Sequence, residues 1–344
     1  MKIVVLMGGA SAEREVSLAT GEAVVSALVK AGHEVRRIDT AFGAKQLAER
    51  TSDAPRVQVG PEPPRVSDLP QAHGALAIDS VKTPSIAETD VVFLALHGGF
   101  GENGGVQSVL DMLGAAYTGS GPLASAAAMD KDLSKRLFLQ AGVPTPPWFL
   151  LSREEAERPK DVEDRVRRAF GFPCVVKPND QGSSVGMTIV QAPEALPDAL
   201  RLAGEYGEEI LVERYIPGRE LTVSILEGYD LPVIEIVPNQ GIYDYTSKYT
   251  AGMTRYVIPA NIPDEIAQEA KRQGLRAFQA LKCRDYARVD FRLSPEGELF
   301  CLEVNTLPGM TATSLVPKAA AVAGISFPDL CTILAEKALK RKTV

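Results

Sequence analysis

The sequence predicts an α/β and α+β protein with more than one domain. Its 344 residues are too many for one typical hydrophobic core. Strand and helix signals alternate along the N-terminal part, which predicts a doubly wound sheet. Further along, a glycine-rich loop at 182–186 lies between two predicted strands, and a third unit of strands and helices follows it.

The N-terminal part predicts a parallel sheet with helices between its strands. Residues 3–7 form an apolar run closed by Gly8-Gly9, which is typical of a buried parallel strand. A helix is predicted from about Ser11 to Gly32. Further strands are predicted over 35–38 and 90–96, and another helix over 105–113. The Pro-rich stretch 51–70 predicts a surface excursion, to which we assign no function.

The remaining chain predicts two more units. In the second, a helix over 131–141 precedes strands over 173–178 and 187–190. In the third, we expect strands over 210–213, 221–226, 287–293 and 299–304, and helices over 264–281 and 327–340. The polar, tyrosine-rich segment 238–256 predicts a functional loop, because long irregular loops are uncommon otherwise. The basic end 337–342 predicts the solvated last turn of a helix.

Composition is typical of an ordinary globular enzyme. The net charge of −7 argues against a nucleic-acid surface, which needs a basic face. Neither a signal peptide nor a run of about 20 apolar residues is evident, so we expect no membrane association. The four cysteines lack metal-binding or disulfide spacing, so reduced thiols and a cytoplasmic location are expected.

Three oxygen ligands predict a magnesium site. Glu303 and Asn305 are two residues apart on a predicted strand and therefore face the same side. Asp290 lies on the neighbouring strand, so a hairpin would bring the three together, and such hard oxygen ligands suit Mg²⁺. Arg288 shares the face of Asp290 and could stabilise an oxyanion or a phosphoryl group. A solvated polar face, or a plain ion pair of Arg288 with a carboxylate, would explain the same pattern.

Two lysines and a small-residue loop predict phosphate contacts. The loop 182–186 reads Gly-Ser-Ser-Val-Gly and lies between two predicted strands, unlike a Walker loop between strand and helix. Lys177 ends the strand before it, and Lys131 opens the second unit. Surface solvation is the alternative for either lysine.

Glu15 and His97 are predicted to share the crevice beyond the N-terminal strands. A carboxylate at Glu15 could hold an ammonium group, although the helix dipole alone would favour it there. His97 ends a strand before Gly98-Gly99, and a structural histidine with satisfied hydrogen bonds is the alternative reading.

Several segments together resemble D-alanine–D-alanine ligases. They span nearly the whole chain in the family's order, and the first and last are specific together, whereas the glycine loop alone would suggest only the ATP-grasp superfamily. The matching segments are 8–17, 97–104, 117–121, 129–131, 177–186 and 303–311.

The resemblance implies an ATP-grasp architecture of three domains. These would be an N-terminal doubly wound (pre-ATP-grasp) domain at 1–129, a central domain at 130–212 and a C-terminal domain at 213–344. The implied reaction joins two D-alanine molecules, with ATP as co-substrate and two Mg²⁺ (or Mn²⁺), for peptidoglycan precursors. It passes through a D-alanyl phosphate. A homodimer is implied as well.

The resemblance also implies a role for each matching residue. Glu15 would bind the first ammonium and His97 would lie near the first carboxylate. Lys131, Lys177 and Ser184 would contact phosphates, Glu213 the adenine amino group and Glu220 the ribose. The remaining positions are the metal ligands Asp290, Glu303 and Asn305, the oxyanion site at Arg288 and the Gly309 backbone, and the second-carboxylate site at Ser314 and the Leu315 backbone.

Segment 238–256 resembles the family's closing ω-loop, with Lys248 near the ATP. Its Tyr249 would form a hydrogen-bonded triad with Ser183 and Glu15, and closure would exclude water from the acyl phosphate. Relatives that make D-alanyl-D-lactate lack this tyrosine, so Tyr249 favours the dipeptide.

One departure from the family pattern is Asn103, where Asp is usual, which leaves a local hydrogen bond open. The rival functions are a D-alanyl-D-lactate or D-alanyl-D-serine ligase and a catalytically silent ATP-binding protein. The silent protein should lack some of the polar residues on the two metal-site strands, and all of them are present.

Overall fold

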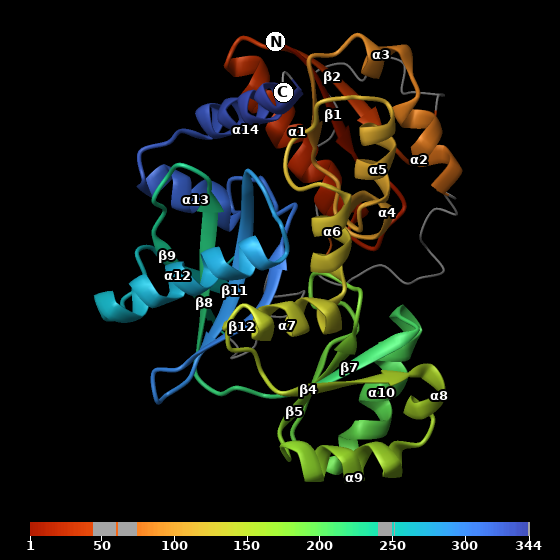
Figure 1. Cartoon of the computed structure of the whole chain (residues 1–344), viewed down its shortest axis with the longest axis vertical. Helices are drawn as coiled ribbons and strands as arrows, with labels where there is room; N and C mark the ends of the chain where they lie inside the picture. The colour runs from red at the N-terminus through yellow and green to blue at the C-terminus, as the bar shows by residue number, and fades with distance from the viewer. Residues whose placement is uncertain (44–59, 61–73, 240–249, 251, 343–344) are drawn as a thin grey trace.

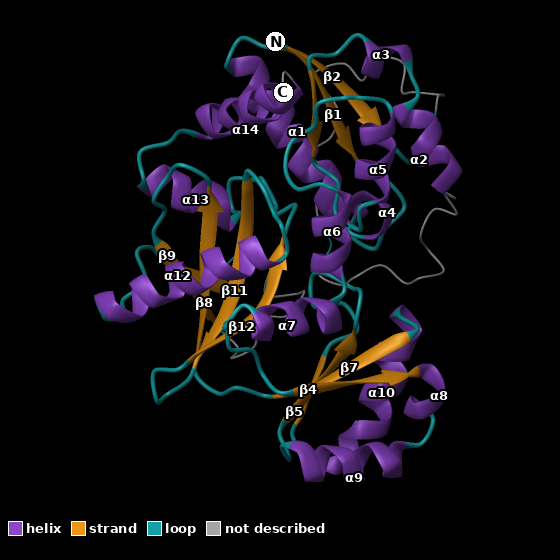
Figure 2. Cartoon of the chain, in the orientation of Figure 1, coloured by secondary structure: helices purple, strands orange, loops and turns teal. Residues whose placement is uncertain are grey.

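The computed structural model describes residues 1–43, 60, 74–239, 250 and 252–342. The predicted excursion at 51–70 and the residues Lys248 and Tyr249 therefore lie outside the described residues, except for Gly60. Strands of the described chain form three sheets in three regions of the molecule (Figure 1). Helices cover each sheet (Figure 2).

The N-terminal sheet is parallel, with the strand order β2-β1-β3. Alternate residues of β1 enter opposite cores: Ile3 and Val5 pack toward α1 and α14, and Val4 and Leu6 toward α2 and α5. This arrangement confirms the doubly wound prediction. The bounds are β1 (Lys2–Met7), α1 (Arg14–Lys30), β2 (Glu34–Asp39), α2 (Gly74–Val81), α3 (Pro84–Ala87), β3 (Val91–Leu94), α4 (Gly99–Glu102) and α5 (Gly105–Met112).

The central sheet is antiparallel, with the order β4-β7-β5-β6, and the glycine loop joins β5 to β6 as predicted. α9 and α10 cover one face, over side chains such as Val176 and Val212. The prediction that the strand at 210–213 belongs to the third unit is wrong. This strand is β7, and it pairs with β4 and β5 of the central sheet. The bounds are β4 (Trp148–Ser152), α8 (Arg153–Ala156), α9 (Pro159–Ala169), β5 (Cys174–Pro178), β6 (Thr188–Val190), η2 (Pro193–Ala195), α10 (Leu196–Tyr206) and β7 (Glu209–Arg214).

The C-terminal sheet is antiparallel, with the order β10-β9-β8-β11-β12. α12 covers one face together with α6 and α7, whose Phe138 is fully buried in the same core as Val289 and Phe291. The helix at 131–141, expected in the second unit, therefore packs with the third sheet. The bounds are α6 (Pro122–Met129), α7 (Lys131–Gln140), β8 (Arg219–Leu226), β9 (Val233–Pro238), β10 (Thr254–Val257), α12 (Asp264–Ala280), β11 (Tyr286–Leu293), β12 (Leu299–Asn305), α13 (Leu315–Val322) and α14 (Phe327–Lys342).

The last helix crosses back to the N-terminal sheet, so the two termini lie near one another (Figure 1). The basic end was predicted to be solvated, but Arg341 on this helix makes specific contacts within the fold. Its guanidinium pairs with the buried Asp285 and donates a hydrogen bond of 2.6 Å to the carbonyl of Tyr117. Asp285 also accepts the Gly119 N–H at 3.1 Å. The pair therefore joins the end of the chain to both the N-terminal and the C-terminal sheets.

Replacing Arg341 with Ala is expected to destabilise the protein. The change leaves the carboxylate of Asp285 buried without its cation. Because a hydrogen bond to a charged group contributes about 1.5–3 kcal/mol, the free energy of unfolding should fall by about this amount. Urea unfolding measures the loss. Lys337→Ala, on the same helix, is the control and should change stability by less than about 0.5 kcal/mol. Equal stability of the two variants would contradict the prediction.

Across the described residues, no single helix is both long and apolar enough to cross a bilayer. α13 and α14 reach the necessary length and composition only when taken together, and they are bent by 105° at the break between them.

Candidate active site

A cleft separates the uncovered face of the central sheet from the C-terminal sheet. Side chains alternate along each strand, so Val175 and Lys177 of β5 face away from α9 and α10 and line this cleft. Leu302 and Glu303 of β12 line the opposite side. Apolar walls with a few charged groups between them suit a planar, anionic ligand.

The glycine loop closes one end of the cleft with its backbone in an unusual conformation. Ser183 and Ser184 both have positive φ, at 49° and 60°. Gly182 packs so closely on the carboxylate of Glu13 that a Cβ there would lie 2.7 Å from its Oε2. A larger residue at 182 would therefore displace the Glu13 carboxylate, through which the loop contacts the N-terminal domain.

Lys131 stands beside this loop at the first position of α7. Asp130 caps the helix by accepting the Leu133 N–H at 3.0 Å. The Lys131 Nζ donates to the carbonyl of Gln181 at 2.6 Å and lies 3.9 Å from Glu303. Burial lowers the pKa of Lys131, and Glu303 opposes that effect. Its ammonium thus joins the loop to the C-terminal strands.

Glu213 binds two lysines at the back of the cleft. Its Oε1 accepts from the Lys177 Nζ at 2.6 Å, and its Oε2 lies 2.8 Å from the Lys135 Nζ. Burial alone would raise the pKa of Glu213, but the two lysines outweigh burial and lower the pKa to about 2. The Glu213 carboxylate therefore binds two lysines where it lines the cleft, and its contact with the adenine amino group stays a prediction.

The predicted oxygen ligands come together on the β11–β12 hairpin. Asp290 pairs in register with Glu303, and Arg288 pairs with Asn305. The Arg288 guanidinium forms an ion pair with Asp290, with an Nη2–Oδ2 distance of 2.8 Å. This is the ion pair that the sequence analysis gave as an alternative to an oxyanion role for Arg288. Thr222 also donates to the Asp290 Oδ1 at 2.6 Å.

The amide oxygen of Asn305 fits the role of a metal ligand. It is buried and accepts no hydrogen bond from any described residue, although a buried polar atom normally has a partner. No group of three or more His, Cys, Asp or Glu side chains suited to a metal occurs within the described ranges. This hairpin offers two carboxylates and one amide, so the phosphates of a bound nucleotide would supply further oxygen ligands.

Glu13, and not Glu15, contacts the glycine loop, which corrects the sequence prediction. The Ser183 hydroxyl donates a hydrogen bond to the Glu13 Oε1, and Glu13 is 8 % exposed. Glu15 is exposed and accepts the N–H of Gly60 at 3.0 Å. The carboxylate that joins the N-terminal domain to the glycine loop is therefore two residues earlier than expected.

The reason is the starting point of α1. Residues 11–13 form a turn, in which the Arg14 N–H donates to the Ser11 carbonyl, and the helix begins at Arg14 instead of near Ser11. Two helical positions correspond to about 200° of rotation. Glu13 at the N-cap thus points toward the glycine loop, and Glu15 points to the opposite side, toward Gly60.

His97 is a buried, neutral histidine. Its Nε2 lies 3.0 Å from the Thr20 hydroxyl, and the ring also makes a hydrogen bond with the backbone of Leu307. Burial and the charge of Arg288 lower its pKa to about 4. These contacts are those of a structural histidine with satisfied hydrogen bonds, which was the alternative prediction. The charge of Arg288 also acts on the ring, so His97 lies near the predicted site.

Protonation of His97 is expected to weaken the folded state as the pH falls. The folded pKa of about 4 lies below the ordinary histidine pKa of 6.5, so the unfolded chain takes up the proton first. The stability difference is absent above pH 6.5 and grows to about 3 kcal/mol near pH 4. Urea unfolding of wild type and His97→Gln measures it, and the variant should show a flatter dependence in this window. Parallel pH profiles would contradict the prediction.

Glu102 is a site residue that our reading of the sequence passed over. It is 8 % exposed and accepts the Gly98 N–H at 2.9 Å. Burial and the neighbouring Glu13 raise its pKa to about 8. Its place in the Gly-rich segment 97–104 was the available signal. A carboxyl group with this pKa is largely protonated at neutral pH, so Glu102 avoids a second negative charge beside Glu13.

The segment 309–315 contacts the N-terminal domain, where the Met310 N–H donates to the Thr20 hydroxyl at 3.5 Å. The Ser314 Oγ accepts the Thr311 N–H at 3.0 Å, and Leu315 begins α13. A Cβ on Gly309 would lie 2.9 Å from the Ser314 Oγ, so a larger residue there would require the Ser314 side chain to move. Asn103, the departure from the family pattern, accepts the Gly105 N–H at 3.1 Å through its Oδ1, which an aspartate would do equally.

Many of the predicted site residues therefore line one cleft, and the contact between Glu13 and Ser183 joins this cleft to the N-terminal domain. Glu220 lines the cleft and pairs with Arg292 at 3.4 Å. Glu15 lies outside, and Lys248 and Tyr249 are not among the described residues. Lys135 and Glu13 were missed, because their roles depend on contacts between distant segments.

Comparison with known proteins identifies the family. A family model described as the D-ala D-ala ligase N-terminus matches residues 2–120, and one described as the D-ala D-ala ligase C-terminus matches residues 137–336. The chain belongs to the D-alanine–D-alanine ligase family. The D-alanine–D-alanine ligase of Pelotomaculum thermopropionicum is 43 % identical, over 99 % of this chain and 97 % of the relative. That of Geobacter sulfurreducens is 44 % identical, over 96 % and 91 %.

Solved structures agree with this assignment. The crystal structure of the Bacillus anthracis D-alanine–D-alanine ligase complexed with ATP has a TM-score of 0.75 at 32 % identity, covering 100 % of this chain and 98 % of that one. A second crystal structure of the enzyme from that organism has a TM-score of 0.77 at 35 % identity, covering 100 % and 99 %. The ATP-grasp fold class predicted from the sequence is confirmed.

Proposed function

We propose that this chain catalyses the ATP-dependent joining of two D-alanine molecules to D-alanyl-D-alanine for peptidoglycan precursors. The contact between Glu13 and Ser183 carries the proposal, because it joins an ammonium-binding carboxylate to a phosphate-type loop. A substrate between them would have its amino group and the transferred phosphate within one enclosed site. The family match over nearly the full chain supports the same reaction.

In the first step, the carboxylate of the first D-alanine attacks the γ-phosphorus of ATP, the bond from this phosphorus to the bridging oxygen breaks, and an acyl phosphate and ADP form. Glu13 holds the ammonium of this D-alanine, and His97 supports the wall beside it. Lys131, Lys177 and the Ser184 loop hold the phosphates, and Glu220 holds the ribose. Positioning and charge account for most of the rate in phosphoryl transfer.

Asp290, Glu303 and Asn305 would hold two Mg²⁺ (or Mn²⁺) at the phosphates. The bound metal would neutralise negative charge on the phosphate oxygens during transfer. The unpartnered Asn305 oxygen and the hairpin register support this ligand set.

In the second step, the amine of the second D-alanine displaces phosphate through a tetrahedral intermediate. Arg288, held against Asp290, and the Gly309 N–H would stabilise its oxyanion. Ser314 and the Leu315 N–H would hold the second carboxylate, since both lie at the start of α13, where a helix favours anions. Tyr249 and Lys248 remain proposals from the sequence.

Three further features belong to this proposal. The domains are proposed at 1–129, 130–212 and 213–344, with the second boundary moved to follow Arg214, because the whole of β7 belongs to the central sheet. A homodimer and a cytoplasmic location are proposed from the resemblance and from the use of ATP. Sedimentation of the purified protein tests the dimer.

The direct test measures phosphate release from ATP and Mg²⁺ with D-alanine, with L-alanine, or with D-alanine plus D-lactate, and identifies the product by mass. Release that requires D-alanine and yields the dipeptide is expected. Release that yields only D-alanyl-D-lactate would overturn the acceptor assigned from Tyr249. No release with any acceptor would overturn the proposed reaction.

A further inference from the structure

The fully buried cation Lys135 lies directly behind the cleft. It projects from α7, four residues after Lys131, and its side chain is 0 % exposed. A lysine is seldom buried unless it is paired, because removing an ammonium from water is costly. Its Nζ lies 2.8 Å from the Glu213 Oε2 and donates to the Thr145 hydroxyl at 2.7 Å. It therefore takes one oxygen of a carboxylate whose other oxygen is bound to Lys177.

The charges of these three groups explain why two lysines are needed. Glu213 carries one negative charge, since its pKa is held near 2, and Lys135 and Lys177 flank it. Lys177 lines the cleft, whereas Lys135 does not. If Lys135 balances Glu213, the positive charge of Lys177 is left over for a phosphate. Without Lys135, Lys177 and Glu213 would form a neutral pair and attract an anion far less.

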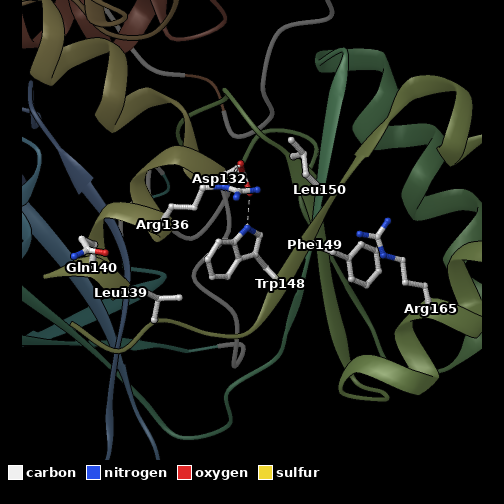
Figure 3. A pocket seen from close by; sticks show the side chains of 8 residues that line it. All are labelled: Asp132, Arg136, Leu139, Gln140, Trp148, Phe149, Leu150 and Arg165. Atoms are coloured by element: carbon white, nitrogen blue, oxygen red, sulfur yellow. Dashed lines mark hydrogen bonds and ion pairs between the residues drawn. The ribbon is translucent and has the colours of Figure 1, made fainter. Parts of the chain in front are cut away.

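The surroundings fix Lys135 in this position. Its Nζ lies 5.1 Å from the centre of the Trp148 ring, a cation–π contact, and Trp148 pairs in register with Glu213 across β4 and β7. The indole N–H of Trp148 donates to the Asp132 Oδ1 at 2.8 Å, and Arg136 grips the same carboxylate (Figure 3). The network reaches from a surface pocket on the outer side of β4 to the back of the cleft.

We propose that Lys135 is a positioning residue for nucleotide binding, which balances the charge of Glu213 so that Lys177 presents an unshared positive charge to the phosphates. Lys135 acts through Glu213 and touches no substrate. The inference deepens the proposed function and rests on nucleotide binding in this cleft.

The test measures the Kd of the full-length protein for Mg²⁺-ADP by calorimetry, without D-alanine. Lys135→Met is expected to raise the Kd by about 10- to 100-fold, the usual effect of losing a residue that orients a binding group. Lys135→Arg should retain part of the affinity. Lys160→Met makes the same substitution at an exposed position of α9, away from Glu213, and should leave the Kd unchanged.

The double variant Lys135→Met/Glu213→Gln separates charge balance from simple structural support. It removes one charge of each sign, so Lys177 keeps its unshared charge, and nucleotide affinity should recover relative to Lys135→Met alone. A structural role for Lys135 would make the losses of the two substitutions add. A double variant that binds more weakly than Lys135→Met would overturn the inference.

A loss of nucleotide binding must be distinguished from a loss of folding. Far-UV circular dichroism and melting temperature show whether each variant is folded. If Lys135→Met does not fold, the double variant is compared with wild type, where a Kd within about tenfold supports the inference and a loss beyond about 100-fold overturns it. A folded Lys135→Met that binds as tightly as wild type overturns the inference alone. A wild-type protein that binds no nucleotide overturns the proposed function as well.

Discussion

Replacing Glu13 with Gln should lower kcat/KM for D-alanine by about 10²- to 10³-fold, because a buried charged hydrogen-bond partner of the substrate ammonium is lost. Glu13 is 8 % exposed and bonded to Ser183, so the amide would fill the same space without the charge. The same charge also opposes Glu102, whose pKa should fall toward its ordinary value in the variant. Steady-state phosphate release at varied D-alanine measures the effect.

Glu15→Gln is the matched control for this experiment. It makes the same chemical change two residues later, at an exposed carboxylate that contacts Gly60. Its activity should stay within about threefold of wild type, as expected of a surface change. A larger loss in Glu15→Gln than in Glu13→Gln would restore the original sequence assignment and contradict the structure.

Loss of the metal ligands is expected to have a comparable effect on catalysis. Glu303→Gln should lower kcat by at least about 10²-fold, since metal-ion stabilisation of the transferred phosphate contributes several kcal/mol. Asn305→Ala should raise the Mg²⁺ concentration needed for half-maximal rate. Because the Asn305 oxygen accepts no hydrogen bond from the described residues, this second variant should unfold at nearly the wild-type urea concentration.

Glu298→Gln is the control at the other end of the hairpin, where the side chain is exposed. Its rate and Mg²⁺ requirement should match those of wild type. A chelator should abolish phosphate release by wild type, and added Mg²⁺ or Mn²⁺ should restore it. If Asn305→Ala had an unchanged Mg²⁺ requirement, the amide would have to be removed from the ligand set.

The alternation of residues along single strands correctly predicted which side chains share a face of a sheet. The period of two in β11 and β12 placed Arg288, Asp290, Glu303 and Asn305 on one face, and the register confirms it. The apolar runs of β1 and β3 likewise predicted a parallel sheet with both faces covered. Such features depend on neighbours in the chain, which a single sequence displays.

Features that depend on distant contacts could not be predicted in the same way. The start of α1 is delayed because Ser11 donates to the carbonyl of His97 at 2.5 Å, which holds the turn before Arg14. That contact lies outside the local pattern, so the active carboxylate was placed on Glu15. The pairing of Lys135 with Glu213 similarly joins α7 to a strand more than 70 residues later.

The return of α14 to the first sheet has a consequence for biosynthesis. Val5 and Val25 belong to a core that also contains Leu330 and Leu334 of this last helix. During translation, the part of this face that packs on α14 must therefore stay uncovered until α14 has been synthesised, while α1 can already cover the rest. The first domain that the ribosome produces is the last to complete its core, and an N-terminal fragment ending near residue 120 would expose that apolar face to aggregation.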